Sequence, residues 1–314
     1  MTRGTRTYSK PPLTPSQHIA LLEERGLTVP DHDRAKRYIR NIGYQRLKYY
    51  CFPFHSSRNI FKPGIEFGDL LHLYIFDRKL RGHILDAIER IEVAVRSVMS
   101  GVLSETYGSH WYTDQSVFTE DFTTCTLRQP QSKFEQFLVE VERQTGKNNH
   151  YRRDPACKHY YDEYCDPDLP PSWVVIEVLS MGTWSRLYEN LTDTKTKKKI
   201  SQHFGFLSQD FAGWIHALTL IRNTCAHHAR IWNRVFTPRA AKINKYAKHI
   251  VDPNSAYCSL VLIQVFLETI TNNSRWAGGL RQLLDEWNAN LPIDLYNEMK
   301  FPTNWYDLDL WKLS

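Results

Sequence analysis

The sequence predicts an all-α protein, and three of its features support this. Apolar residues recur every three or four positions from residue 67 to residue 107, which is the spacing of a helix with one buried face. Helix-capping residues precede other apolar segments, and no segment alternates apolar and polar residues as a half-buried strand does. With 314 residues, of which 42% are hydrophobic, the chain is long enough to bury a substantial core.

The first two helices are marked by their capping residues. Thr14 followed by Pro15 is typical of a helix N-cap and first helical position, and Gly26 can end this helix. Asp31 or Asp33 can cap the second helix. The sequence therefore predicts an N-terminal helical region.

The clearest helix covers residues 67–107, as one amphipathic helix or as two in tandem. Its apolar stripe consists of Leu73, Phe76, Leu80, Ile84, Ile88, Ile91, Val95 and Val98. We expect the charged residues beside this stripe to form a solvated face with ion pairs one turn apart. They are Asp77, Arg78, Lys79, Arg81, Glu89, Arg90 and Glu92.

Further helices are expected in the rest of the chain. Residues 150–172 contain four prolines and are predicted to be a loop, whereas the lysine-rich segment 192–205 is predicted to lead into a short helix. Gly182 can break the helical pattern around it, and Pro238 can end another. The other expected helices are 128–150, 173–191, 211–234 with Ser208 or Asp210 as its cap, and 255–270.

The predicted organisation has three parts. Residues 1–12 form a flexible tail and residues 13–66 an N-terminal helical region. Residues 67–314 form the main helical domain, with a loop-rich insertion near residues 150–172. The sequence shows no internal repeat that would divide the main domain further.

The charge and the aromatic content favour a nucleic-acid partner. The formal net charge is +6, and the chain contains 17 tyrosines and 9 tryptophans. Cations contact phosphates, and aromatic rings stack on bases. No run approaches the roughly 18 apolar residues of a membrane span, and the basic N-terminus lacks the apolar segment of a secretory signal. The cysteines show no paired framework, which favours a cytoplasmic location; they are Cys51, Cys125, Cys157, Cys165, Cys225 and Cys258.

Residues 221–234, IRNTCAHHARIWNR, concentrate cations, imidazoles and an amide in a stretch that is predicted to be helical. In a helix, Asn223 and His227 are neighbours one turn apart, and the long side chain of Arg222 can reach the same face. These three groups can converge on one phosphate.

Such a set suits metal-independent RNA cleavage. The ribose 2′-hydroxyl attacks its own phosphate when one group accepts its proton and another protonates the leaving 5′-oxygen. Histidine, with a reference pKa of about 6.5, can perform either task. Arginine binds the phosphate and stabilises its developing charge. The expected products carry a 2′,3′-cyclic phosphate and a 5′-hydroxyl, although the spacing alone also fits ordinary solvated residues.

A metal site is the competing interpretation. Cys225, His227 and His228 are close in sequence, but a helix turns only some of them in one direction. A second, looser group consists of His150, Cys157, His159 and Cys165. Neither group has the two regular close pairs of a structural zinc site, so we expect no metal and no cofactor.

Five segments in order along residues 14–311 resemble one protein family. The chain is similar to the bacterial abortive-infection (Abi) proteins of the AbiD/AbiF type in GYQRLKYYCFPF, LYIFDRKLRGHILDAIERIEVAVRS, PSWVVIEVLSMGTWSRLY, RNTCAHHARIWNR and KFPTNWYDLDLW. One such segment would be weak support, whereas five in the same order are strong support.

The resemblance implies the HEPN superfamily, which consists of all-α ribonucleases with four to six residues between an arginine and a histidine. Arg222, Asn223 and His227 match that motif and are the expected catalytic residues. The resemblance also implies a HEPN-like helical bundle, and a homodimer in which two motifs form one composite site. It further implies an anti-phage toxin of a toxin–antitoxin system, controlled by a structured non-coding RNA.

Basic residues near the motif and elsewhere are expected to bind RNA. They are His228, Arg230, Arg78, Arg81, Arg152, Arg153, Lys197, Lys198 and Lys199. Two other functions stay open: a non-catalytic RNA-binding protein on the same fold, and a helical interaction protein that senses a phage component. Replacing His227 in a catalytic toxin abolishes activity and preserves RNA binding, whereas an interaction protein purifies without RNA.

Overall fold

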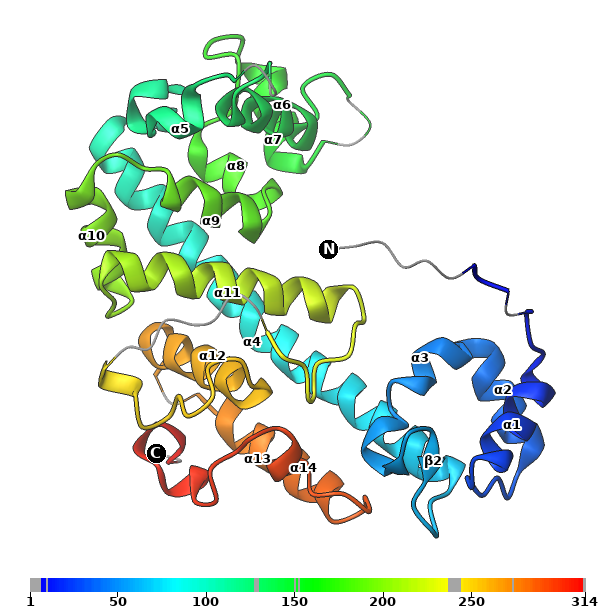
Figure 1. Ribbon diagram of the computed structural model, residues 1–314. Helices are drawn as coiled ribbons and strands as arrows, with labels where there is room; N and C mark the ends of the chain where they lie inside the picture. Colours follow the sequence, from blue (N-terminus) through cyan, green and yellow to red (C-terminus); the bar gives the residue numbers. More distant parts are fainter. Residues whose placement is uncertain are drawn as a thin grey trace. The chain divides into compact units, whose positions relative to one another are not determined.

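The computed structural model describes residues 7–9, 11–126, 130–149, 151, 153–236, 244–272 and 274–312. These residues are mainly helical, which confirms the predicted all-α class (Figure 1). The helices are α1 (Pro15–Glu24), α2 (His32–Ile42), α3 (Tyr44–Lys48), α4 (Phe67–Tyr107), α5 (Glu120–Thr123), α6 (Lys133–Thr145), α7 (Pro155–Glu163), α8 (Ser172–Val178), α9 (Met181–Glu189), α10 (Thr194–His203), α11 (Ser208–Ala226), α12 (Ala256–Ile270), α13 (Trp276–Asn288) and α14 (Leu295–Glu298). Strands β1 (His55–Ser57) and β2 (Ile60–Phe61) form a small antiparallel pair.

The described residues form two compact units. The N-terminal unit comprises residues 1–80 and 280–298, and the main unit comprises residues 81–279 and 299–314. Helices α4 and α13 each contribute residues to both units. None of the helices in the described ranges is both long and apolar enough to span a membrane.

The capping residues place the first two helices where they were predicted. Thr14 Oγ1 accepts a hydrogen bond from the Gln17 backbone amide at 3.3 Å, and Gln17 Oε1 accepts one from the Thr14 backbone amide at 2.8 Å. Gly26 follows the helix with a φ of 90°, a conformation that costs glycine little. Asp31 caps α2 by accepting from the Arg34 amide at 2.8 Å, so it is the N-cap of the two candidates.

Helix α4 has the predicted bounds and is one continuous helix. Its apolar stripe is buried, apart from the half-buried Val98. The prediction of a solvated charged face is wrong for Asp77, Arg81 and Glu92, which are only 0%, 4% and 7% exposed. Tyr50 donates a hydrogen bond to the Asp77 carboxylate at 2.7 Å, which offsets the cost of burying that group.

Three other predictions need correction. The proline-rich segment contains α7, which starts with Asp154 as its N-cap and Pro155 in the first turn, where a proline removes no helical hydrogen bond. The break in the next helical stretch lies between α8 and α9 rather than at Gly182, because Ser180 starts a new helix by accepting from the Thr183 amide. The lysines expected in a connection lie within α10.

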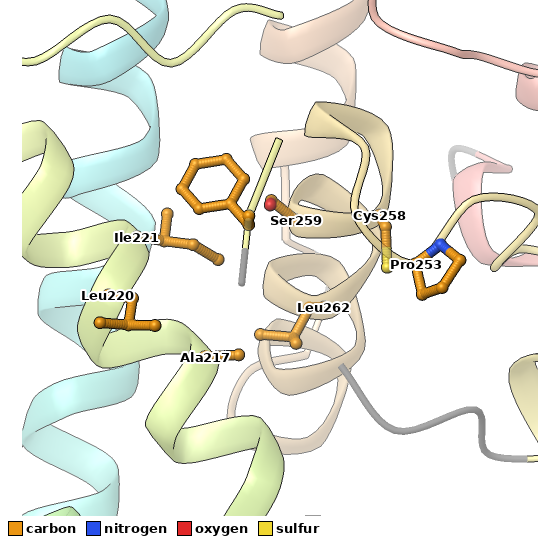
Figure 2. Close-up of a pocket in the computed structure, with 8 residues that line it drawn as sticks. Ala217, Leu220, Ile221, Pro253, Cys258, Ser259 and Leu262 are labelled. Atoms are coloured by element: carbon orange, nitrogen blue, oxygen red, sulfur yellow. The ribbon is translucent and has the colours of Figure 1, made fainter. Parts of the chain in front are cut away.

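Helix α11 is the central element of the main unit. It packs against α9, α10 and α12. Helix α12 is buried along most of its length. Figure 2 shows side chains of α11 and α12 facing a small apolar pocket of about 10 Å³, which has room for about one water molecule. This side of α11 is therefore a packing surface, and its ligand-accessible residues must lie elsewhere.

Candidate functional site

The candidate site lies at the C-terminal end of α11. The helix ends at Ala226, not at residue 234 as predicted, and His227 is its C-cap. The His228 amide donates to the Cys225 carbonyl and the Ala229 amide to the Thr224 carbonyl, both at 3.0 Å. This pair of bonds is the Schellman arrangement, which requires a left-handed residue between the helix and the exiting chain.

His228 occupies this left-handed position, with a φ of 57°. Glycine is the usual residue there, and a residue with a Cβ pays a steric cost of roughly 1 kcal/mol. The turn directs the chain away from the helix axis immediately after His227. As a result, His227 and His228 are both exposed at the helix end.

Arg222 is fixed on two sides of its guanidinium. Its Nε lies 3.6 Å from Oε2 of Glu92, and its Nη1 donates to Oδ1 of Asn223 at 3.3 Å. Its side chain keeps 37% of its surface exposed. Nη2 makes no hydrogen bond to the residues that the structure describes, so this edge of the guanidinium is available to an external anion.

Glu92 and Arg96 on α4 are the two residues of this site that the sequence analysis missed. The Glu92 carboxylate, with a 9% exposed side chain, forms an ion pair with the Arg96 guanidinium one turn later, in addition to its contact with Arg222. Arg96 Nε is buried and has no hydrogen-bond partner among the described residues. One carboxylate thus holds two guanidiniums, and one of them keeps an unsatisfied buried donor.

Two neighbouring pockets open at the site. Asn223 and His227 line the first, of about 320 Å³, together with residues that include Arg234. Arg222 lines the second, of about 380 Å³, together with Glu92 and Arg96. The hydrogen bond between Arg222 and Asn223 joins the two. Asn223 thus shares one pocket with His227 and contacts Arg222, which lines the other pocket with Arg96.

The predicted RNA-binding residues nearest the motif have different surroundings. Arg81 is buried, and its Nη1 donates to the Ala229 carbonyl at 3.4 Å. It therefore supports the turn that follows His228. Arg230 is half-buried, whereas His228 is exposed.

The more distant candidates also differ. Arg78 and Lys198 are exposed. Arg153 donates to the Gly146 and Lys147 carbonyls and stacks over Tyr161, so it caps the end of α6. Arg152 lies outside the described residues.

The lysines of α10 are not equivalent. Lys197 Nζ donates to the Glu189 carbonyl at 2.8 Å, and burial lowers the pKa of this amine. Lys199 forms a 2.7 Å ion pair with Glu105, and both side chains are more than half exposed. Lys198 is therefore the member of the predicted set on α10 that faces solvent without one of these pairings.

The described residues contain no group of three histidine, cysteine or acidic side chains that could hold a metal ion. His150, a member of one of the two groups considered for zinc, lies outside the described residues. Burial raises the pKa of the Cys157 thiol to about 11, which disfavours the thiolate that a metal requires.

Comparison with known proteins gives one match. A family model described as Abi-like protein matches residues 37–233, which include α4, α11 and all three motif residues. No curated protein and no solved structure is significantly similar to the chain. The match ends one residue before Arg234, close to the end of the candidate site.

Proposed function

The chain belongs to the family of Abi-like, abortive-infection proteins, and on this premise we propose that it is a metal-independent endoribonuclease. The observation that supports this most directly is that a fixed arginine and an exposed histidine lie at the end of one helix, linked by Asn223. Arg222 is held by Glu92 and Asn223, and His227 lies one helical turn beyond Asn223. The proposed catalytic residues are Arg222, Asn223 and His227.

The contacts suggest a role for each group. Nη2 of Arg222 would bind a nonbridging phosphate oxygen and stabilise the charge that develops there. Asn223 Oδ1 keeps the guanidinium in place by accepting its Nη1–H. His227 would exchange a proton with either the 2′-hydroxyl or the leaving 5′-oxygen. The 2′-oxygen forms a bond to phosphorus as the bond to the 5′-oxygen breaks, which leaves a 2′,3′-cyclic phosphate.

One chain provides one motif imidazole, whereas the reaction uses a proton acceptor and a proton donor. We therefore also propose a homodimer in which His227 of each copy serves one of the two steps. The biological role would be that of an anti-phage toxin in a toxin–antitoxin system. A structured non-coding RNA would regulate it, and the basic residues near the site would bind RNA.

A non-catalytic RNA-binding protein is the second candidate, and one observation favours it. Arg222 and His227 line separate pockets, so each can hold a different phosphate without acting on one reacting atom. Both candidates bind RNA, and they differ only in whether the bound strand is cut.

The test compares two histidines of the same helix region. His227→Ala should lower the cleavage rate by about 10²–10⁴-fold while RNA binding persists, because general acid–base catalysis typically contributes that much. His216 is also exposed on α11, and His216→Ala should cleave at the wild-type rate. The assay follows end-labelled RNA in the presence of a chelator and identifies the cyclic phosphate. Binding without cleavage by the wild type would favour the second candidate, and wild-type cleavage by His227→Ala would exclude the proposed mechanism.

A further inference from the structure

The N-terminal unit exposes a pair of aromatic rings. Tyr49 and Phe52 keep 46% and 49% of their surface exposed, and their ring centroids are 6.4 Å apart. Between them, Tyr50 and Cys51 are only 1% and 2% exposed. The buried residues anchor this short segment between α3 and Phe54, so the two rings are held outward by the fold.

A third ring extends the pair. His55 is half-buried and lies with its ring centroid 6.0 Å from that of Phe52. The angle between these two rings is 82°, and the ring centroid of the buried Phe61 lies 4.7 Å from that of His55. The aromatic pair is therefore backed by a rigid cluster, which reduces the entropy lost when a flat ligand stacks on it.

The segment that carries these rings is strongly basic. Residues 34–65 contain eight lysines and arginines and no aspartate or glutamate. Isolated exposed aromatic residues are common on protein surfaces and need no explanation. Two adjacent rings within a segment of 32 residues that has no carboxylate are a different case, because the local charge favours an anionic ligand.

Two of these lysines belong to the ring-bearing segment or bond to it. Lys62 is exposed and donates from Nζ to the backbone carbonyl of Pro53, the residue after Phe52, at 3.0 Å. Lys48 immediately precedes Tyr49. Its positive charge opposes the rise in the pKa of the Cys51 thiol that burial causes. The backbone that carries the two rings therefore has a lysine at its start and a second lysine bonded to it.

We propose that Tyr49 and Phe52, with Lys48 and Lys62, form a binding site for single-stranded RNA. The ring faces would stack on bases, and the ammonium groups would contact the neighbouring phosphates. Bases are accessible for stacking only where they are unpaired, so single strands and loops bind in preference to duplex. The site lies in a different unit from the proposed catalytic residues and does not depend on their activity.

The test measures binding of a fluorescent oligouridylate to the full chain by anisotropy over a range of salt concentrations. Every variant also carries His227→Ala, so that the protein does not cleave the oligonucleotide during the measurement. Combining Tyr49→Ala with Phe52→Ala should weaken binding by about 10-fold or more, because each stacked base depends on one ring. The dependence on salt should stay unchanged. Tyr306→Ala is the matched control. It removes a 42% exposed ring of the main unit and should leave the affinity unchanged.

Replacing the lysines, unlike replacing the rings, should change the dependence of binding on salt. Lys48→Gln combined with Lys62→Gln should reduce the slope of log affinity against log salt by about 1.4, which is about 0.7 for each lost contact to a single strand. Tyr49→Phe and Phe52→Tyr keep both rings and should bind like the background. They also show that the rings, rather than the Tyr49 hydroxyl, carry the binding.

An oligonucleotide of abasic residues separates stacking from charge. It should bind the alanine variant and the background equally, because it has no base to stack. Unchanged oligouridylate binding by the alanine variant would overturn the proposal and indicate a protein partner for these rings. An equal loss of affinity for the abasic strand would also overturn it. Absence of cleavage by the wild type would refute the nuclease and leave this result unaffected.

Discussion

The Glu92 carboxylate lies 3.6 Å from Arg222 Nε and also pairs with Arg96, so it fixes the position of both guanidiniums. Glu92→Gln removes the charge and preserves the shape. Removing one partner of a buried ion pair typically costs about 3–5 kcal/mol, and since Arg222 remains partly solvated we expect a loss near the lower end. Cleavage should fall mainly through kcat, because the substrate phosphate meets a misplaced Arg222. Urea denaturation and steady-state kinetics measure the two effects.

Glu89 provides the control for that experiment. It lines the same pocket from the same helix, is exposed, and has no ion pair among the described residues. Glu89→Gln should therefore leave both stability and kcat close to wild type. Equal effects of the two substitutions would mean that the charge of the pocket matters and the contact to Arg222 does not.

His228→Gly should stabilise the folded protein. At a φ of 57° a glycine avoids the steric cost of a Cβ, and we expect the free energy of unfolding to rise by about 0.5–1 kcal/mol. His216→Gly, placed inside the helix, should lower it by a similar amount. Urea denaturation compares the variants. A loss of stability in His228→Gly would show that the contacts of this imidazole outweigh the strain of its backbone.

Two adjacent lysines of α10 should respond differently. Lys198→Gln should lower the salt slope of single-stranded RNA binding by about 0.7, because an exposed lysine contacts phosphate directly. Lys197→Gln should leave the slope nearly unchanged and reduce stability, since its side chain is half-buried and its Nζ is bonded to the Glu189 carbonyl. Filter binding at several salt concentrations tests this, and equal slopes for both variants would assign neither lysine to the RNA interface.

Mixing two inactive variants tests the composite site. Arg222→Ala and His227→Ala subunits should each be inactive as homodimers. If one arginine and one histidine suffice, a mixed dimer has one working pair, and mixing should recover part of the activity. Light scattering must show a dimer in the same preparation. A monomer that still cuts RNA would refute the shared site.

Stability should fall as the pH decreases from about 7.5 to 5.5. Burial lowers the pKa of His83, whose ring is stacked 5.0 Å from the Trp276 indole. The unfolded chain takes up the proton below about pH 6.5, whereas the folded chain resists it, so acid favours unfolding. Burial lowers the pKa values of His18, His55 and His249 in the same direction. Urea denaturation at each pH measures the trend, which His83→Gln should weaken.

The long helix was predictable and its buried carboxylate was not. The apolar stripe of α4 runs from Leu73 to Val98, about seven helical turns, so the pattern alone predicts one long helix. The same pattern assigned Glu92 to the solvated side, because it reports only one buried face. A second face is buried where other elements approach, and nothing near Glu92 in the sequence indicates that Arg222 comes within ion-pair distance.

The end of α11 shows a different limit. The segment after Ala226 has neither the glycine that usually ends a helix in this manner nor a nearby proline before residue 238. His228 adopts the left-handed conformation instead, which the sequence does not indicate. Helix α7 was missed because a signal was present but misinterpreted. Pro155 suggests a loop unless Asp154 is recognised as the N-cap of a helix that begins at Pro155.

The continuity of α4 also limits where the protein can tolerate insertions and deletions. One codon added or lost between Ile84 and Glu92 would rotate the rest of the helix by about 100° and shift it by about 1.5 Å. The buried stripe would then turn toward water, and Glu92 would lose Arg222. We expect viable variants to accept substitutions on the exposed side of α4 and to place changes of length outside it.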